Sequence, residues 1–289
     1  METNTTSAPN DARNAPTRYL PGEQGKIAYR VIGKGTPIIL CNRFRGILDT
    51  WDPAFLDTLA QKHQVIIFDY PGIGLSDGQL PHNMLDVAKA VNSVAAAFEL
   101  ENFDLLGWSY GGAVAQTYAS NFGDKVKNLI LIGANPPGKN DAPLEQAFLD
   151  AAFKPYNDLR DDEVLFFEPN IPASVEAAKL SRERIASRKA DLSIAVTPDK
   201  FGDYFKGVAD YQQDSYASRE KLATAPFPIL ILSGDHDPSC PVENWFPLVR
   251  VWKSAQLHVI GSSGHAPQYE FPEYSVKLID LFLGGLSAK

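Results

Sequence analysis

The stretch Gly107-Trp108-Ser109-Tyr110-Gly111-Gly112 decides how this sequence folds. It follows an apolar run at 103–106, typical of a buried strand, and precedes a helical pattern that begins at Ala113. A turn this sharp between a strand and a helix strains its central residue, so small residues must flank it. The stretch therefore predicts that Ser109 stands above the edge of a sheet. The Tyr110 N–H, at the helix start, is placed to stabilise a developing oxyanion.

Strands and helices alternate on both sides of this turn. The apolar runs are mostly continuous, which is typical of a parallel sheet covered on both faces. In the clearest helical pattern, Leu85, Ala88, Val91, Ala95 and Phe98 recur every three to four residues. The alternation predicts an α/β fold with a doubly wound, mostly parallel sheet. The predicted strands are 27–31, 37–41, 65–69, 103–107, 129–133, 229–234 and 257–260, and the predicted helices are 53–61, 84–99, 110–122, 245–252 and 274–283.

One long stretch interrupts the alternation. It has no convincing buried strand, it is rich in aromatic residues, and Leu144, Phe148, Ala151 and Ala152 recur in it at helical spacing. At about eighty residues it is too long for a simple connection. We therefore predict a helical cap inserted into the core. The predicted division is residues 1–18 as a flexible N-terminal segment, 19–137 and 220–289 as the core, and 138–219 as the cap.

Charge and composition disfavour several classes of function. Acidic residues outnumber basic ones, 35 to 27, and the formal net charge of −8 disfavours nucleic acid or an anionic membrane as a partner. No basic start precedes an apolar core, and no run of eighteen apolar residues occurs, so we expect a cytoplasmic protein that acts on a small molecule. The two cysteines, Cys41 and Cys240, do not suggest a disulfide scaffold or a zinc site. We expect no metal and no cofactor, and the oligomeric state stays open.

A serine hydroxyl needs a base within hydrogen-bond reach, and His265 is the best candidate among the five histidines. It lies in the loop 261–267, directly after the last predicted strand. Loops at the carboxyl ends of strands hold the sites of open α/β sheets. His63 and His82 lie in polar connections and His258 lies within a strand, so each is a poorer candidate.

The imidazole in turn needs a buried carboxylate that fixes its tautomer. The strand that begins at 229 ends in Ser233-Gly234-Asp235-His236-Asp237-Pro238, which offers two acids. Asp237 stands in the turn three residues after Gly234, whereas Asp235 is still leaving the strand. We therefore favour Asp237, and the chain order becomes Ser109, Asp237, His265.

These motifs resemble those of the α/β-hydrolase superfamily, over roughly residues 26–283. Besides the serine turn, they are Gly234-x-x-Asp237, Gly264-His265-Ala266-Pro267, and the stretch from Phe68-Asp69-Tyr70-Pro71 to Gly72-Ile73-Gly74-Leu75-Ser76. The resemblance implies the order nucleophile, acid, histidine found here. It also implies structural roles for Asp69 and Ser76.

One position departs from that family's pattern. The family usually has His-Gly after its third strand, followed by the residue whose amide completes the oxyanion hole. Counting back from Trp51, which resembles a tryptophan of the family, places Asn42-Arg43 there and makes Phe44 the second oxyanion donor. Arginine adds a side chain where the backbone should approach closely, so Arg43 either points away or alters the hole. Arg43 or Arg45 could instead bind a substrate carboxylate, although we favour a surface role for each.

The predicted function is hydrolysis of a carboxylic ester or lactone by a serine hydrolase. The aromatic cap favours a small, largely apolar substrate, and Trp108 and Arg43 are the residues predicted to bind it. By resemblance, Ser109 in place of an aspartate counts against dehalogenase and epoxide hydrolase chemistry. The resemblance leaves open C–C bond hydrolysis, other triad chemistry that needs no ester, and non-catalytic ligand binding on the same fold.

Overall fold

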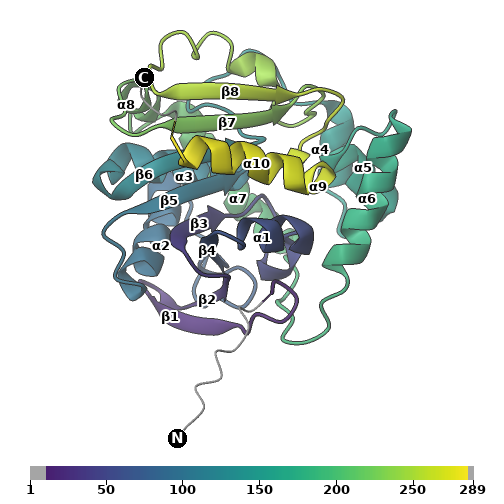
Figure 1. Cartoon of the computed structure of the whole chain (residues 1–289), viewed down its shortest axis with the longest axis horizontal. Coiled ribbons are helices and arrows are strands. Elements are labelled where there is room, and N and C mark those ends of the chain that lie inside the picture. The colour runs from purple at the N-terminus through teal and green to yellow at the C-terminus, as the bar shows by residue number, and fades with distance from the viewer. Residues whose placement is uncertain (1–10, 286–289) are drawn as a thin grey trace, which may run out of the picture.

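The computed structural model describes residues 11–285 of the 289-residue chain (Figure 1). One eight-stranded sheet runs through it in the order β1-β2-β4-β3-β5-β6-β7-β8. The β1–β2 and β2–β4 pairs are antiparallel, and the pairs from β4–β3 to β7–β8 are parallel. The doubly wound, mostly parallel sheet predicted from the sequence is therefore confirmed. The strands are β1 (Arg18–Gly22), β2 (Gly25–Ile32), β3 (Thr36–Cys41), β4 (His63–Phe68), β5 (Phe103–Trp108), β6 (Val126–Ile132), β7 (Ile229–Gly234) and β8 (Ala255–Ile260).

Helices cover both faces of the sheet. In Figure 1, α1 (Pro53–Leu59), α9 (Pro267–Glu270) and α10 (Pro272–Leu283) lie in front of it, and α2 (Met84–Ala97) and α3 (Tyr110–Asn121) lie behind. Each face has its own apolar core, and consecutive residues of β4 belong to different cores. Ile66 packs on the α2 and α3 side and Ile67 on the α1 and α10 side, and both are almost completely buried. Burial on both faces explains why the strand sequences are continuously apolar.

Between β6 and β7 the chain forms helices joined by loops and contains no strand. We call residues 133–228 the β6–β7 segment. Its helices are α4 (Gln146–Ala152), α5 (Leu159–Phe166), α6 (Pro172–Ile185), η3 (Pro198–Lys200), α7 (Phe201–Gln213) and α8 (Ser218–Ala223). α4, α5 and α6 pack on one another in turn, and α6 also packs on α9. α7 contacts α2 and α3 instead. Figure 1 shows α4, α5 and α6 together at one end of the sheet. The remaining short helices are η1 (Leu48–Thr50), η2 (Gly123–Lys125) and η4 (Val242–Asn244).

Two elements differ from the sequence-based predictions. β1 was not predicted, because it is an edge strand without an apolar run; Tyr19 is half exposed and Pro21 has no N–H to donate. The helix predicted at 245–252 is absent, and a series of turns follows η4 there. Pro247 stands inside this stretch and cannot donate the backbone hydrogen bond that a helix needs.

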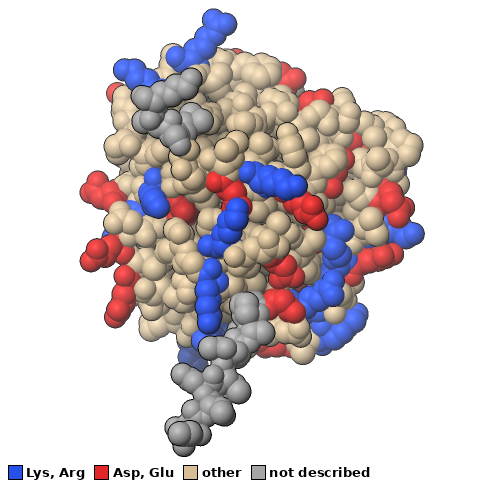
Figure 2. All heavy atoms as spheres, in the orientation of Figure 1, with Lys and Arg blue, Asp and Glu red and all other residues tan. Residues whose placement is uncertain are grey.

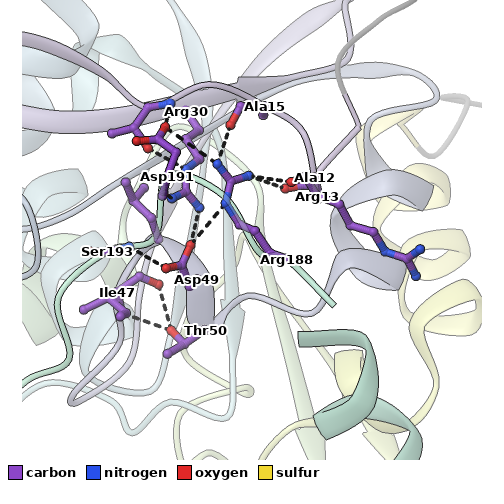
Figure 3. A network of polar contacts seen from close by, with 12 residues as sticks. Ala12, Arg13, Ala15, Arg30, Ile47, Asp49, Thr50, Arg188, Asp191 and Ser193 are labelled. Carbon is purple, nitrogen blue, oxygen red and sulfur yellow. Dashed lines mark hydrogen bonds and ion pairs between the residues drawn. The ribbon is translucent and has the colours of Figure 1, made fainter. Parts of the chain in front are cut away.

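A buried polar network holds residues 11–17 against the core (Figure 3). Ala15 is fully buried, and the Arg188 guanidinium donates hydrogen bonds to three backbone carbonyls of this stretch, at 2.9 to 3.1 Å. Arg30 of β2 and Asp49 of η1 continue the network. This part of the predicted flexible segment is therefore packed, because partners distant in sequence bind its backbone. Residues 1–10 lie outside the described part of the chain.

Charges of both signs are interspersed on the face that carries α1 and α10 (Figure 2). Lys62 Nζ, for example, lies 2.6 Å from Asp280 Oδ2 of α10. Among residues 11–285, no helix has the length and apolar character needed to cross a membrane.

Candidate active site

Ser109 lies at the sharp turn between β5 and α3, where the sequence places it. Its backbone φ is 57°, a left-handed conformation that is strained for any residue other than glycine. Gly111 allows this turn, because a Cβ there would lie 2.0 Å from the Cys41 carbonyl oxygen of β3. The first turn of α3 therefore packs directly on β3, and Ser109 is left lining a cavity.

His265 and Asp237 form a buried hydrogen-bonded pair. His265 Nδ1 lies 2.9 and 2.8 Å from the two carboxylate oxygens of Asp237. Asp237 Oδ1 also accepts the N–H groups of Ser239 and Cys240, at 2.8 and 2.7 Å. His265 Nε2 is buried and has no hydrogen-bond partner within the described residues. A histidine that donates its Nδ1–H to Asp237 carries a free lone pair on Nε2, which is the tautomer that a general base requires.

Asp235 does not take part in this pair. Its Oδ1 accepts the Ser263 N–H at 3.2 Å and lies 3.2 Å from His236 Nδ1. More than a third of the Asp235 side chain is exposed, whereas the Asp237 side chain is fully buried. Of the two acids weighed from the sequence, Asp237 is the one in contact with His265.

Gly133, at the end of β6, leaves room for the acid–histidine pair. Its φ is 48°, and a Cβ there would lie 2.5 Å from the His265 carbonyl oxygen and 2.9 Å from His265 Nδ1. Sequence analysis missed this role. The available signal was a glycine directly after an apolar strand, next to a strand that is followed by Asp237.

Trp108 was predicted to bind substrate, but the structure places it behind His265. It is fully buried and does not line the cavities at Ser109. Its indole Nε1 donates a 3.0 Å hydrogen bond to the His265 carbonyl oxygen, and its ring packs on Tyr269 of α9. Because successive side chains of a strand point to opposite faces, Trp108 points into the core beside α9. It is a positioning residue for the His265 loop.

Asn42 closes the loop after β3. It is almost completely buried, its Nδ2 donates to the Ile47 carbonyl at 3.0 Å, and its Oδ1 accepts the Arg43 N–H at 2.8 Å. The backbone N–H groups of Phe44 and Tyr110 have no partner within the described residues. Both residues line the cavity of Ser109. This is the placement expected of two oxyanion donors.

Arg43 points inward, so the surface role favoured from the sequence is wrong. Its guanidinium carbon lies 4.5 Å from the ring centre of Phe166 and 5.4 Å from that of Trp108. Its Nη1 donates a 2.7 Å hydrogen bond to the Phe44 carbonyl oxygen. The loop does not need glycine at position 43, because the left-handed residue is Arg45, with φ 59°. Burial lowers the pKa of Arg43 from its usual value.

Arg45 uses its guanidinium to connect two parts of the structure. Nη1 donates to the carbonyls of Ala152 and Lys154, at 3.1 and 2.8 Å, and Nη2 donates to that of Pro155 at 2.9 Å. The side chain therefore ties the loop after β3 to the end of α4. These three bonds occupy the guanidinium, and two of them lie at the surface, which is in line with the surface role favoured from the sequence.

Asp69 and Ser76 have the structural roles that the resemblance implies. The buried carboxylate of Asp69 accepts hydrogen bonds from Leu48 N–H, Leu75 N–H and Ser193 Oγ, at 2.8 to 2.9 Å. The Ser76 hydroxyl donates to the Asp69 carbonyl. Burial raises the pKa of Asp69 to about 6. The two residues hold together the loops that follow β3 and β4.

A largely apolar cavity of about 280 Å³ opens beside Ser109, and we call it the apolar cavity. Phe44 and the first turn of α3 form its floor, and helices α4 and α7 form its walls. The polar side chains in its lining are few, namely those of Asn135, Asn140, Gln212 and Ser239 besides Ser109 itself. The aromatic residues and other apolar groups around it are Phe44, Leu144, Phe148, Phe153, Tyr204, Phe205, Val208 and Tyr211.

One group within residues 11–285 brings three possible metal ligands together: Asp237, Cys240 and His265, whose ligand atoms lie within 4.8 Å of one another. Burial raises the pKa of the Cys240 thiol well above its usual value, which disfavours the thiolate that binds metals. The Asp237 carboxylate already accepts two backbone hydrogen bonds and contacts His265. These residues suit an acid–histidine pair better than a metal centre.

Comparison with known proteins identifies the family to which this architecture belongs. Residues 36–272 match the family described as alpha/beta hydrolase fold. The chain is 26% identical over 267 residues to a 2-hydroxy-6-oxo-2,4-heptadienoate hydrolase from Pseudomonas putida, covering 87% of this chain and 90% of that protein. It is 28% identical over 232 residues to a poly(3-hydroxyalkanoate) depolymerase from Ectopseudomonas oleovorans, covering 80% and 78%. The structure of an alpha/beta hydrolase fold protein from Chitinophaga pinensis superposes with a TM-score of 0.85 at 25% identity, covering 96% of this chain and all of that one. Since the family match runs from the start of β3 to the start of α10, the chain belongs to the alpha/beta hydrolase fold family.

Proposed function

We propose that this hydrolase cleaves a carboxylic ester or a lactone of a small, largely apolar substrate through an acyl-enzyme. One observation carries the proposal. His265 donates to the buried Asp237 through Nδ1, leaves Nε2 without a partner, and lines the same small space as the strained Ser109. A nucleophile, a base and an orienting acid in this arrangement are the parts that acyl transfer requires.

In the proposed reaction, Ser109 Oγ attacks the carbonyl carbon while His265 Nε2 accepts the hydroxyl proton. Asp237 stabilises the imidazolium that forms, and the Phe44 and Tyr110 amides bind the oxyanion. The imidazolium then donates its proton to the leaving alcohol, and the acyl group stays on Ser109. Water, deprotonated by the same histidine, attacks the acyl-enzyme, and the imidazolium returns that proton to Ser109 Oγ as the acid leaves.

We further propose that residues 138–219 act as a cap over the substrate. Residues of this stretch, chiefly on helices α4 and α7, supply most of the lining of the apolar cavity, which favours a hydrocarbon-rich group there. The similarity to a protein named as a poly(3-hydroxyalkanoate) depolymerase supports carboxylic acid derivatives as substrates.

Hydrolysis of a C–C bond is the second candidate. The relative from P. putida is named for a substrate, 2-hydroxy-6-oxo-2,4-heptadienoate, whose name contains a ketone and an acid but no ester. The same serine, histidine and aspartate would serve this chemistry. Turnover of a 2-hydroxy-6-oxo dienoate by wild-type protein at a higher kcat/KM than any ester would favour it over our first proposal.

The decisive variant is Ser109→Ala. We expect it to lose about 10⁴-fold or more of the activity on p-nitrophenyl acetate and butyrate, because an alanine cannot form the acyl-enzyme. Ser93→Ala on α2, outside the linings of the cavities at Ser109, is the matched control and should retain wild-type rates. Circular dichroism verifies that both variants fold. Activity of Ser109→Ala within tenfold of wild type would contradict the proposal, and fluorophosphonate labelling of wild type without turnover of any substrate would favour a ligand-binding role.

A further inference from the structure

A second cavity lies beside Arg43 and has no lining residue in common with the apolar cavity. It has a volume of about 290 Å³ and lies between α5, α6 and Tyr269 of α9. Arg43 and Phe166 line it, and we call it the arginine cavity. The charged side chains in its lining are two arginines, Arg43 and Arg182, and one acid, Asp162.

A narrow space of about 20 Å³ at the nucleophile joins the linings of the two cavities. It is lined by Ser109 and His265, and it shares Phe44 and Phe148 with the apolar cavity. On the other side it shares Arg43 and Phe166 with the arginine cavity. The small space at Ser109 therefore has lining residues in common with both cavities, and Arg43 and Phe166 stand between it and the arginine cavity.

Arg43 has unused hydrogen-bond donors at this junction. An arginine side chain has five N–H donors, and the single hydrogen bond that this one makes to residues 11–285 runs from Nη1 to the Phe44 carbonyl oxygen. Nε is buried without a partner, and no carboxylate lies within 4.0 Å of the guanidinium, counting only residues 11–285. A buried donor left unpaired is unfavourable, so a ligand that pairs with Arg43 gains binding free energy.

The acid in the cavity does not form an ion pair with Arg43. Asp162 Oδ2 is paired with Arg182 Nη1, and Arg182 also donates to the Asn157 carbonyl at 3.1 Å. Arg182 and Asp162 therefore form a pair of their own, and the Asp162 carboxylate acts on Arg43 only from a greater distance. Phe166 and Trp108, on which the Arg43 guanidinium stacks, fix the position of its charge.

We propose that Arg43 binds an anionic oxygen group of the substrate, such as a carboxylate, in the arginine cavity. The preferred substrates then join an apolar group, held in the apolar cavity, to an anionic group held by Arg43, with the cleaved bond between them. This inference rests on the proposed function for the position of the cleaved bond. The aromatic residues of the cap alone indicate an apolar substrate, and the inference adds an anionic group to it.

The test compares two pairs of esters, each an anionic ester and its neutral amide counterpart. In the first pair the charge is on the acyl part: the 4-nitrophenyl monoester of adipic acid, and the same compound with a primary amide in place of the free acid. In the second pair the charge is on the leaving group: 4-carboxyphenyl acetate and 4-carbamoylphenyl acetate. The two pairs together cover both orientations of a substrate between the cavities.

The variants are Arg43→Gln, which removes the charge, and Arg43→Lys, which keeps it. We expect Arg43→Gln to reduce kcat/KM for the anionic member of one pair roughly ten- to hundredfold more than for its amide partner. Arg43→Lys should recover part of that loss. The control is Arg160→Gln, which deletes a charge from α5 at an exposed site paired with Glu163 and outside the cavity linings. It should change both members of each pair equally.

Equal losses for the anionic and neutral members of both pairs, or no loss at all, would overturn the inference. Dissociation constants of the same esters, measured by calorimetry in the Ser109→Ala background, separate it from the proposed function. If wild type hydrolyses none of the esters but binding of an anionic member still weakens tenfold or more in Ser109→Ala/Arg43→Gln, the proposed function fails and the anion site stands. If hydrolysis occurs and charge has no effect on rate or binding, the reverse holds.

Discussion

The carboxyl edge of the sheet and the β6–β7 segment supply opposite kinds of residues to one site. At the sheet edge, Asp237 and His265 are buried, Asp237 accepts two backbone N–H groups and contacts His265, and the His265 carbonyl accepts the Trp108 indole N–H. In the β6–β7 segment, the residues that line the apolar cavity are mostly apolar, and residues such as Phe153 and Phe205 are more than a third exposed. Hydrogen bonds between buried groups impose narrow geometry, whereas apolar contacts tolerate changes of shape. Under the proposed function, this difference assigns the reaction to the sheet edge and the choice of the substrate's apolar group to the β6–β7 segment.

The strongest test of this comparison is at the sheet edge. Asp237→Asn should reduce kcat roughly 10³-fold or more, because the amide favours the wrong histidine tautomer. Asp235→Asn is the matched control, two residues away and without a contact to His265, and should cost less than about tenfold. Steady-state rates on p-nitrophenyl butyrate measure both. A larger loss for Asp235→Asn than for Asp237→Asn would move the orienting role to Asp235.

The next test concerns how the β6–β7 segment is attached. In the network of Figure 3, the Asp49 carboxylate contacts Arg30 Nη1 at 2.5 Å, Arg188 Nε at 3.5 Å and the Ser193 N–H at 2.5 Å. Asp49→Asn leaves two largely buried guanidinium groups without that charge, and we expect the free energy of unfolding to fall by about 3 kcal/mol. Asp86→Asn, which breaks an exposed pair with Lys89, should cost under about 1 kcal/mol. Equal midpoints of urea unfolding for the two variants would show that the network does not stabilise the attachment.

The smallest expected effect is on the aromatic wall. Phe205→Ala should lower kcat/KM for p-nitrophenyl hexanoate by roughly three- to tenfold, because part of the apolar contact with the acyl chain is lost. Activity on the acetate should change little, since a two-carbon acyl group does not reach that wall. Tyr156→Ala provides the control, because this residue of the same segment is 88% exposed and does not line the apolar cavity. If hexanoate and acetate change together, the wall contributes to the reaction as well as to substrate choice.

Local signals made the sheet and the serine turn predictable. A continuous apolar run followed by small residues around Ser109 specifies the strand, the turn and the helix within about fifteen residues. The positions of His265 and Asp237 followed from topology, since parallel strands end at the same edge of the sheet. The seven strands that were predicted therefore overlap β2 to β8, and only the exposed edge strand β1 was missed.

Features that depend on distant partners were not predictable. Arg43 points inward, where its guanidinium stacks on the ring of Phe166, a residue far along the chain. Residues 11–17 are packed because Arg188 binds their carbonyls. Trp108 stands next to the nucleophile in sequence, yet its side chain points to the other face of the strand and supports the His265 loop. Single-sequence patterns do not contain such pairings.

Strands β6 and β7 are neighbours in the sheet, and this affects which changes of sequence length the protein can accept between them. The two strands align residue for residue, from Leu129 opposite Ile229 to Ile132 opposite Leu232, and this alignment depends on their own apolar side chains. The entropy of closing a flexible loop grows only logarithmically with its length, by about 0.6 kcal/mol for each doubling. Insertions and deletions between the two strands are therefore tolerated by the sheet. Under the proposed function, the helices between β6 and β7 can therefore be replaced during evolution, which changes the substrate range while Ser109 and the sheet stay the same.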